Sequence, residues 1–217
     1  MPANFCEASL CAWVRQPGNT WSNVGFLVAA FFIWRATRAP RSHQLRGLAW
    51  ALAAMGIGSA FFHASETLVG EWVDYAGMYV GTAFMLMVVV RRAFGSSRLT
   101  QALVFWGFTA AGMSTLLLDD VFVRPTFMVA NLLCPIFEIA LFARRSTRAK
   151  SYRWLWAAYA VFLPAVALWR LDLNGMLCNP QNHVLSGHGM WHLLDALMFW
   201  FSFLYYRQFD SPTNEVA

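Results

Sequence analysis

The sequence predicts an all-α fold, a bundle of seven transmembrane helices. The first reason is composition: 59% of the 217 residues are hydrophobic and only 12% are charged, whereas a soluble domain has roughly 25% charged residues. The second reason is that the apolar residues form stretches of the length that crosses a bilayer as a helix, roughly 20 residues. This composition excludes a soluble enzyme, a disordered chain and a nucleic-acid-binding module.

Seven apolar stretches are the predicted membrane helices, and the loops between them are too short to hold a second domain. They lie near Asn23–Trp34, Leu45–His63, Val69–Val90, Leu99–Leu118, Thr126–Phe142, Tyr152–Trp169 and Val184–Tyr206. We therefore expect a single domain over residues 1–217, with an outer N-terminal segment at 1–22 and a cytoplasmic tail at 208–217. Residues 1–17 lack a basic segment followed by an apolar run, so the first membrane helix should act as its own insertion signal.

The basic residues predict the orientation of the bundle. Thirteen of the 16 follow the first, third, fifth and seventh stretches: Arg35, Arg38, Arg41, Arg46, Arg91, Arg92, Arg98, Arg144, Arg145, Arg148, Lys150, Arg153 and Arg207. Only Arg15, Arg124 and Arg170 flank the opposite ends. Because cytoplasmic loops carry an excess of Lys and Arg, the N-terminus should lie outside the cytoplasm and the C-terminus inside. An odd number of spans requires the same arrangement.

Three histidines should meet near the outer surface of the membrane. His188 and His192 are four residues apart and therefore share one helix face. His63 ends the second stretch, which runs outward, while the seventh stretch runs inward, so all three imidazoles lie at a similar depth. Asp74, near the outer start of the third stretch, and Ser59, one turn before His63, belong to the same level.

This combination is typical of a catalytic zinc site. Three imidazoles can bind Zn2+ and leave the fourth position for water, and a nearby carboxylate such as Asp74 can accept the proton of that water. Other roles remain open for the same residues: a histidine at a helix end can be capped or interfacial, a serine can bond to its own helix, and an aspartate near the interface can be solvated.

Four passages form a wider pattern. They are FCE at residues 5–7 with NTWSN at 19–23, GSAFFH at 58–63, the aspartate at position 74, and GHGMWHLLD at 187–195. This pattern resembles the alkaline ceramidases and their bacterial relatives, which belong to a wider set of seven-helix membrane hydrolases that includes the adiponectin-type receptors.

The resemblance implies a role for each matching residue. His63, His188 and His192 would bind zinc, Asp74 would orient and deprotonate the zinc-bound water, and Ser59 would help to stabilise the oxyanion. The substrate would be ceramide or a similar N-acyl lipid of the membrane, hydrolysed to a fatty acid and a free sphingoid base. We therefore expect a zinc-dependent amide hydrolase of lipid and sphingolipid metabolism.

The sequence departs from this family at a second metal site. Eukaryotic members bind calcium through acidic and amide groups near the N-terminus. Glu7 remains here, but Asn4, Phe5, Ser9 and Gln16 stand where other residues would be expected. Because calcium prefers several charged oxygens, we expect weak Ca2+ binding or none.

The family also implies a disulfide between Cys6 and Cys178, because related ceramidases link the same two segments. Both cysteines should lie on the outer side, where an oxidising compartment would let them pair. Two free thiols are the alternative, and Cys11 is a competitor for Cys6.

Two carboxylates are expected inside the bundle. Asp195 follows His192 by one turn, and it could accept the ring N–H of a liganding imidazole or make a helix-packing hydrogen bond. Glu138, in the fifth stretch, has no evident basic neighbour and could bond to Asn131 or to a lipid head group.

Other functions follow from the same pattern. A seven-helix receptor or sensor could keep a structural zinc without turnover, although Asp74 favours an enzyme. The substrate could also be a non-sphingoid N-acyl lipid. A transporter would show broken helices or internal repeats, and the sequence has neither. Arginine-rich loops, with Lys150 as the only lysine, and the compact length favour a multi-pass protein of a bacterial inner membrane.

Overall fold

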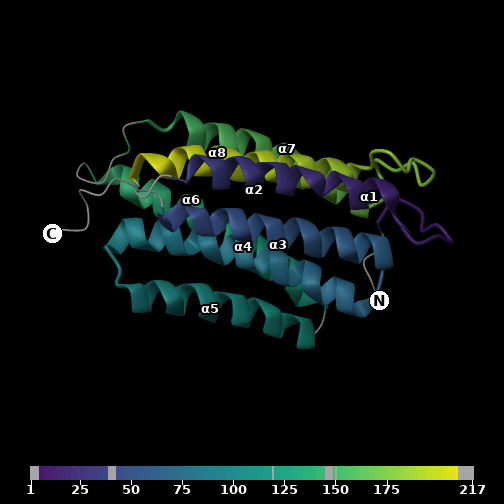
Figure 1. Cartoon of the computed structure of the whole chain (residues 1–217), viewed down its shortest axis with the longest axis horizontal. Coiled ribbons are helices and arrows are strands. Elements are labelled where there is room, and N and C mark those ends of the chain that lie inside the picture. Colours follow the sequence, from purple (N-terminus) through teal and green to yellow (C-terminus); the bar gives the residue numbers. More distant parts are fainter. Residues whose placement is uncertain (1–4, 39–42, 119, 145–148, 150, 210–217) are drawn as a thin grey trace.

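A computed structural model describes residues 5–38, 43–118, 120–144, 149 and 151–209. Within these residues the chain is helical and contains no strand. The α-helices are α1 (Pro17–Ser22), α2 (Val24–Ala36), α3 (His43–Ser65), α4 (Leu68–Phe94), α5 (Arg98–Ser114), α6 (Asp120–Ala143), α7 (Arg153–Leu173) and α8 (Gly187–Tyr206). Two 3₁₀ helices follow α5 and α8: η1 (Thr115–Leu117) and η3 (Arg207–Phe209). The longer helices run side by side along one axis (Figure 1).

Each of the seven predicted stretches overlaps one helix, from α2 to α8 in chain order. Among the described residues, four segments are long and apolar enough to cross a membrane: Gln44–Ser65, Leu68–Phe94, Pro125–Ala143 and Arg153–Leu173. The prediction of a helical membrane protein is therefore confirmed in this form. The short helix α1 was not predicted, because six residues are too few to show a periodic pattern.

Polar side chains fix the start of the helices that form the site. The Thr67 side chain accepts a hydrogen bond from the Gly70 N–H and so begins α4. The Ser186 hydroxyl accepts one from the Gly189 N–H and begins α8. Such caps satisfy N–H groups that have no partner within the helix. They place Asp74 and the histidines of α8 in defined turns.

The helices pack as two close pairs joined by α2, with α6 against α4. The pairs α3–α4 and α7–α8 pack most closely, and α2 lies against both α3 and α8. Figure 1 shows α5 at the edge of the bundle, next to α4. The main neighbour of α6 is α4, and side chains of α6 also share the buried core with those of α7 and α8.

Most of the described arginines lie at the end of the bundle opposite α1. There α2 and α4 end and α3, α5 and α7 begin (Figure 1). Arg15 and Arg170 lie at the α1 end. Four of the basic residues used for the predicted orientation, Arg41, Arg145, Arg148 and Lys150, lie outside the described residues.

The structure corrects the expectation for Glu138. Its carboxylate forms an ion pair with Arg92 of α4 and accepts a hydrogen bond of 2.6 Å from the Tyr205 hydroxyl of α8. Asn131 donates instead to the Phe127 carbonyl. The sequence offered no basic neighbour because Arg92 lies 46 residues earlier in the chain. The three helices α4, α6 and α8 are thus tied together at the end away from α1.

The predicted tail begins inside the folded part of the chain. Gln208 donates a hydrogen bond to the Ser151 carbonyl at 3.0 Å, and the Arg92 guanidinium lies 4.0 Å from the centre of the Phe209 ring. Both residues belong to η3. Residues 210–217 lie outside the described part of the chain.

Candidate metal centre and active site

The three predicted histidines come together at the α1 end of the bundle. His63 comes from the last turns of α3, and His188 and His192 come from the first two turns of α8. All three are buried, and one ring nitrogen of each lies within 4.8 Å of those of the other two. The Nε2 atoms of His63 and His188 are 3.2 Å apart. Within the described residues, this group is the one found with the spacing of a metal site.

Gln16, the residue before α1, determines the tautomer of His63. The Nδ1 atom of His63 lies 2.8 Å from the Gln16 Oε1 atom. The amide is oriented by its other end, because Gln16 Nε2 donates to the Glu7 carbonyl at 3.3 Å. Since Oε1 can only accept, His63 Nδ1 must carry the proton. The Nε2 atom of His63 therefore presents a lone pair to the histidine cluster.

Ser22, the last residue of α1, has the same effect on His192. The Ser22 hydroxyl donates its hydrogen to the Asn19 carbonyl at 2.9 Å. Its oxygen lies 2.8 Å from the His192 Nδ1 atom. With the hydroxyl hydrogen used, that oxygen accepts, so the His192 Nδ1 atom is the donor. The Nε2 atom of His192 is then also left with a lone pair.

These features fit a divalent metal ion. Metals bind the neutral imidazole, and the ring nitrogen that does not ligate is typically held by a polar partner, as Gln16 and Ser22 hold theirs. Nitrogens that each lie about 2.0–2.1 Å from a tetrahedral Zn2+ are about 3.3 Å from one another. The observed separation of 3.2 Å between the Nε2 atoms of His63 and His188 matches that value.

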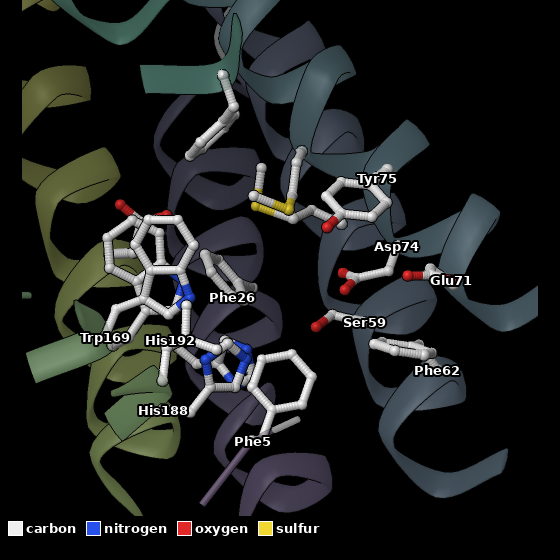
Figure 2. A pocket seen from close by; sticks show the side chains of 16 residues that line it. Phe5, Phe26, Ser59, Phe62, Glu71, Asp74, Tyr75, Trp169, His188 and His192 are labelled. Carbon is white, nitrogen blue, oxygen red and sulfur yellow. The ribbon is translucent and has the colours of Figure 1, made fainter. Parts of the chain in front are cut away.

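Asp74 and Ser59 face the histidines across a cavity. Both side chains are buried, and the Ser59 hydroxyl of α3 lies within hydrogen-bonding reach of the Asp74 carboxylate of α4. Figure 2 shows these two groups on one wall and His188 with His192 on the other. The open space inside the cavity is about 40 Å3. The remaining lining is mostly aromatic or apolar: Phe5, Phe26, Met55, Phe62, Tyr75, Met78, Phe127, Trp169, Leu173 and Trp191, with Glu71 and Asp195.

Asp195 lines the same cavity and is buried. The ring N–H groups of His63 and His192 are bonded to Gln16 and Ser22. A role for Asp195 beside a liganding imidazole therefore stays a prediction.

The predicted disulfide is confirmed: Cys6 and Cys178 are bonded, and their Cα atoms are 5.3 Å apart. Cys11 is a free, exposed cysteine and Cys134 a free, buried one. The bond fastens the N-terminal segment to the loop before α8. The centre of the Phe5 ring lies 4.1 Å from the centre of the His188 ring and 4.9 Å from that of the His63 ring.

Glu7 is buried beside the centre and has protein partners on both oxygens. Its Oε1 and Oε2 atoms accept the N–H groups of Gly18 and Asn19, each at 2.8 Å. His183, in the loop before α8, places its Nδ1 atom 3.1 Å from Oε1. Glu7 therefore holds the start of α1 and the loop before α8 together. Asn4, part of the calcium prediction, lies outside the described residues.

The fold and the site define a helical membrane protein with a buried three-histidine centre opposite a carboxylate. Residues 2–216 match the model of the family described as Ceramidase. The chain belongs to the ceramidase family, whose members are hydrolases of amide bonds in membrane lipids. A search of curated proteins found no match.

Proposed function

We propose that this protein is a zinc-dependent hydrolase that cleaves ceramide or a similar N-acyl lipid within the membrane. The products are a fatty acid and a free sphingoid base. The observation that carries the proposal is the group of His63, His188 and His192, of which the last two line a cavity opposite Asp74 in an apolar helical bundle. An amide bond resists hydrolysis, so this reaction needs an activated water and a proton donor for the departing amine.

The histidines would hold the metal. When bound there, Zn2+ would lower the pKa of its water to about 7 and polarise the substrate carbonyl. Gln16 and Ser22 favour the tautomer of His63 and His192 that has its proton on Nδ1 and leaves Nε2 free to bind. Because these partners are themselves buried and hydrogen-bonded, the ring orientations are set before metal or substrate arrives.

Asp74 is the group that moves the proton. It accepts a proton from the attacking water and transfers it to the amine nitrogen as the carbon–nitrogen bond breaks, so that amide and water yield carboxylic acid and amine. Ser59 orients the Asp74 carboxylate and can donate to the carbonyl oxygen as negative charge develops there. The burial of both residues keeps bulk water away from this exchange.

The cavity walls suit a lipid substrate. Met55, Met78, Phe127 and Trp191 offer apolar surface to alkyl chains. We further propose that α2, α5 and α8 also cross the membrane, which gives seven spans. The arginines at the end away from α1 support a cytoplasmic location of that end. A bacterial inner membrane fits the arginine-rich loops.

The Asp74→Asn variant tests this proposal. Asparagine keeps the shape of the side chain but cannot take the proton, so hydrolysis should fall by at least about a hundredfold, while the bound zinc measured by elemental analysis stays at the wild-type level. The assay compares an N-acyl sphingosine with an N-acyl ethanolamine and an N-acyl amino acid, which separates the sphingoid substrate from the alternatives.

Glu66→Gln is the matched control, because Glu66 lies at the same end of the bundle but outside the cavity, paired with Arg15 at 3.5 Å. It should keep both zinc and turnover. Undiminished hydrolysis by Asp74→Asn would refute the assigned base. Wild-type protein that retains zinc and hydrolyses none of the three lipids would indicate a receptor or sensor instead.

A further inference from the structure

Asp172 is a buried carboxylate at the end of α7 that the proposed reaction does not use. Its side chain bridges two segments that are far apart in the sequence. The Oδ2 atom accepts a hydrogen bond from the His188 backbone N–H at 3.0 Å, and the Oδ1 atom accepts one from the Cys6 backbone N–H at 3.0 Å. Hydrogen bonds to a charged acceptor are stronger than neutral ones, so this bridge holds both backbones firmly.

The bond to His188 is more than an ordinary helix cap. Ser186 already caps α8, since its hydroxyl accepts the Gly189 N–H at 2.7 Å. Asp172 takes a different first-turn N–H, that of a predicted metal ligand, and adds negative charge where the helix dipole is positive. Gly187 permits this close approach: a Cβ atom there would lie 3.0 Å from the Asp172 Cβ atom and 3.2 Å from the Leu168 carbonyl oxygen.

The bond to Cys6 fixes the backbone next to Phe5, whose ring covers the histidines and forms the Phe5 cover. Cys6 is fixed by the disulfide to Cys178, and its neighbour Phe5 lies against the His188 and His63 rings, with centre-to-centre distances of 4.1 Å and 4.9 Å. One carboxylate therefore holds the backbone of His188 with one oxygen and the base of the Phe5 cover with the other.

We propose that Asp172 is a positioning residue that fixes His188 and the Phe5 cover relative to each other, and so maintains the geometry of the three-histidine centre. The inference rests on the proposed metal-binding function. It predicts that loss of this carboxylate weakens metal binding although Asp172 touches neither the metal nor the substrate.

The test uses full-length protein in detergent and the variant Asp172→Asn. An amide can accept only one of the two N–H groups and turns an N–H donor toward the other. The dissociation constant for Zn2+, measured by competition with a chelator, should rise about tenfold, at the lower end of the range for residues that support metal ligands. The visible absorption of the Co2+-loaded variant should change, because that spectrum reports the geometry of the ligands.

A second variant, Gly187→Ala, keeps the carboxylate but pushes it away from His188. It should change both readouts in the same direction and to a smaller degree, which keeps the inference testable even if Asp172→Asn folds poorly. The matched control is Glu138→Gln, which removes a buried carboxylate at the other end of the bundle. It should lower the melting temperature and leave the Zn2+ dissociation constant and the Co2+ spectrum unchanged.

Wild-type affinity and spectrum in Asp172→Asn would overturn the inference, and so would an equal loss of affinity in Glu138→Gln. Wild-type protein that binds neither ion would contradict the proposed function and the inference together. Wild-type protein that binds zinc but hydrolyses no N-acyl lipid would contradict the proposed reaction alone, because the metal readouts of Asp172 would still stand.

Discussion

At the scale of single residues, the role of His192 depends on one hydroxyl hydrogen. The Ser22 hydroxyl gives that hydrogen to the Asn19 carbonyl, so its oxygen can only accept from His192. Had Ser22 donated to the ring, the His192 Nε2 atom would carry a proton and could not bind a metal. The hydrogen bonds around the imidazoles, more than their proximity, therefore indicate a metal centre.

The variant Ser22→Ala tests this argument. It removes the Ser22 oxygen and leaves the Asn19 backbone as the remaining acceptor for the His192 ring, so the preference for this tautomer and ring orientation is weakened. The Zn2+ dissociation constant should rise by about ten- to a hundredfold, as measured by chelator competition on the purified protein.

Thr20→Ala is its control in the same helix. The Thr20 hydroxyl bonds to the Gln16 carbonyl at 2.7 Å and makes no bond to an imidazole, so zinc binding should stay within about twofold of wild type. If Thr20→Ala weakens zinc binding as much as Ser22→Ala does, the effect comes from the stability of α1 and the tautomer argument is wrong.

The histidines could be predicted from the sequence and their partners could not. The spacing of His188 and His192 and the depth of His63 are properties of regular helices, which a sequence reveals. Gln16 and Ser22 are ordinary polar residues beside a Pro-initiated helix, and they are 47 and 170 residues away from the rings that they hold. Only the NTWSN passage, which includes Ser22, hinted at a role for this segment.

At the scale of secondary-structure elements, the distance between α3 and α4 sets the spacing of Ser59 and Asp74 on one wall of the cavity. Gly77 of α4 lies against Met55 of α3 so closely that a Cβ atom at position 77 would be 2.7 Å from the Met55 Cα atom. Asp74 is one turn earlier on the same helix, and Ser59 is one turn after Met55 on α3. The spacing of the two backbones therefore controls the pair Asp74 and Ser59.

Gly77→Ala should push the two helices apart. Because the obstructing atom belongs to the backbone, the strain cannot be relieved by a rotamer change, and we expect a destabilisation of about 1–3 kcal/mol with reduced hydrolysis. The melting temperature and the turnover rate of the purified protein measure these effects.

Gly107→Ala in α5 is the matched substitution. A Cβ atom there would meet nothing within 4 Å, so the higher helix propensity of alanine should raise stability by up to about 1 kcal/mol. Equal melting temperatures and turnover rates in the two variants would show that close packing at Gly77 does not determine the positions of Asp74 and Ser59.

The helices themselves followed from hydrophobic stretches, but their ends did not. The fourth stretch was predicted to reach Leu118, whereas α5 ends at Ser114 and continues as the 3₁₀ helix η1. The start of α8 at Gly187 depends on Ser186 and Asp172, and the second of these comes from another helix. Such contacts between distant segments are invisible in a pattern of apolar residues.

At the scale of the whole molecule, the two ends of the bundle hold different groups of residues. The α1 end holds the histidines, Asp74 and the disulfide, and the opposite end holds the buried pair of Arg92 and Glu138. Charge patterning predicted that the ends differ. It could not predict that Arg92 pairs inside the bundle, because this contact depends on how α4 and α6 pack.

Removal of the disulfide should affect the site and not only stability. In the double variant Cys6→Ser/Cys178→Ser, the segment that carries Phe5 loses its covalent anchor, so we expect a lower melting temperature and a several-fold faster release of Zn2+ to excess chelator. Cys11→Ser is the control, since Cys11 is exposed and free. Unchanged zinc release in the double variant would show that hydrogen bonds alone hold the Phe5 cover in place.

The separation of the centre along the chain has a consequence for biosynthesis. Gln16 and Ser22 emerge from the ribosome early, yet two of the three imidazoles arrive only with α8, and 170 residues separate Ser22 from His192. If the centre holds a metal ion as proposed, a nascent chain halted before α8 would offer only one of its three histidines. Loading of the ion would then follow the synthesis of the final helix.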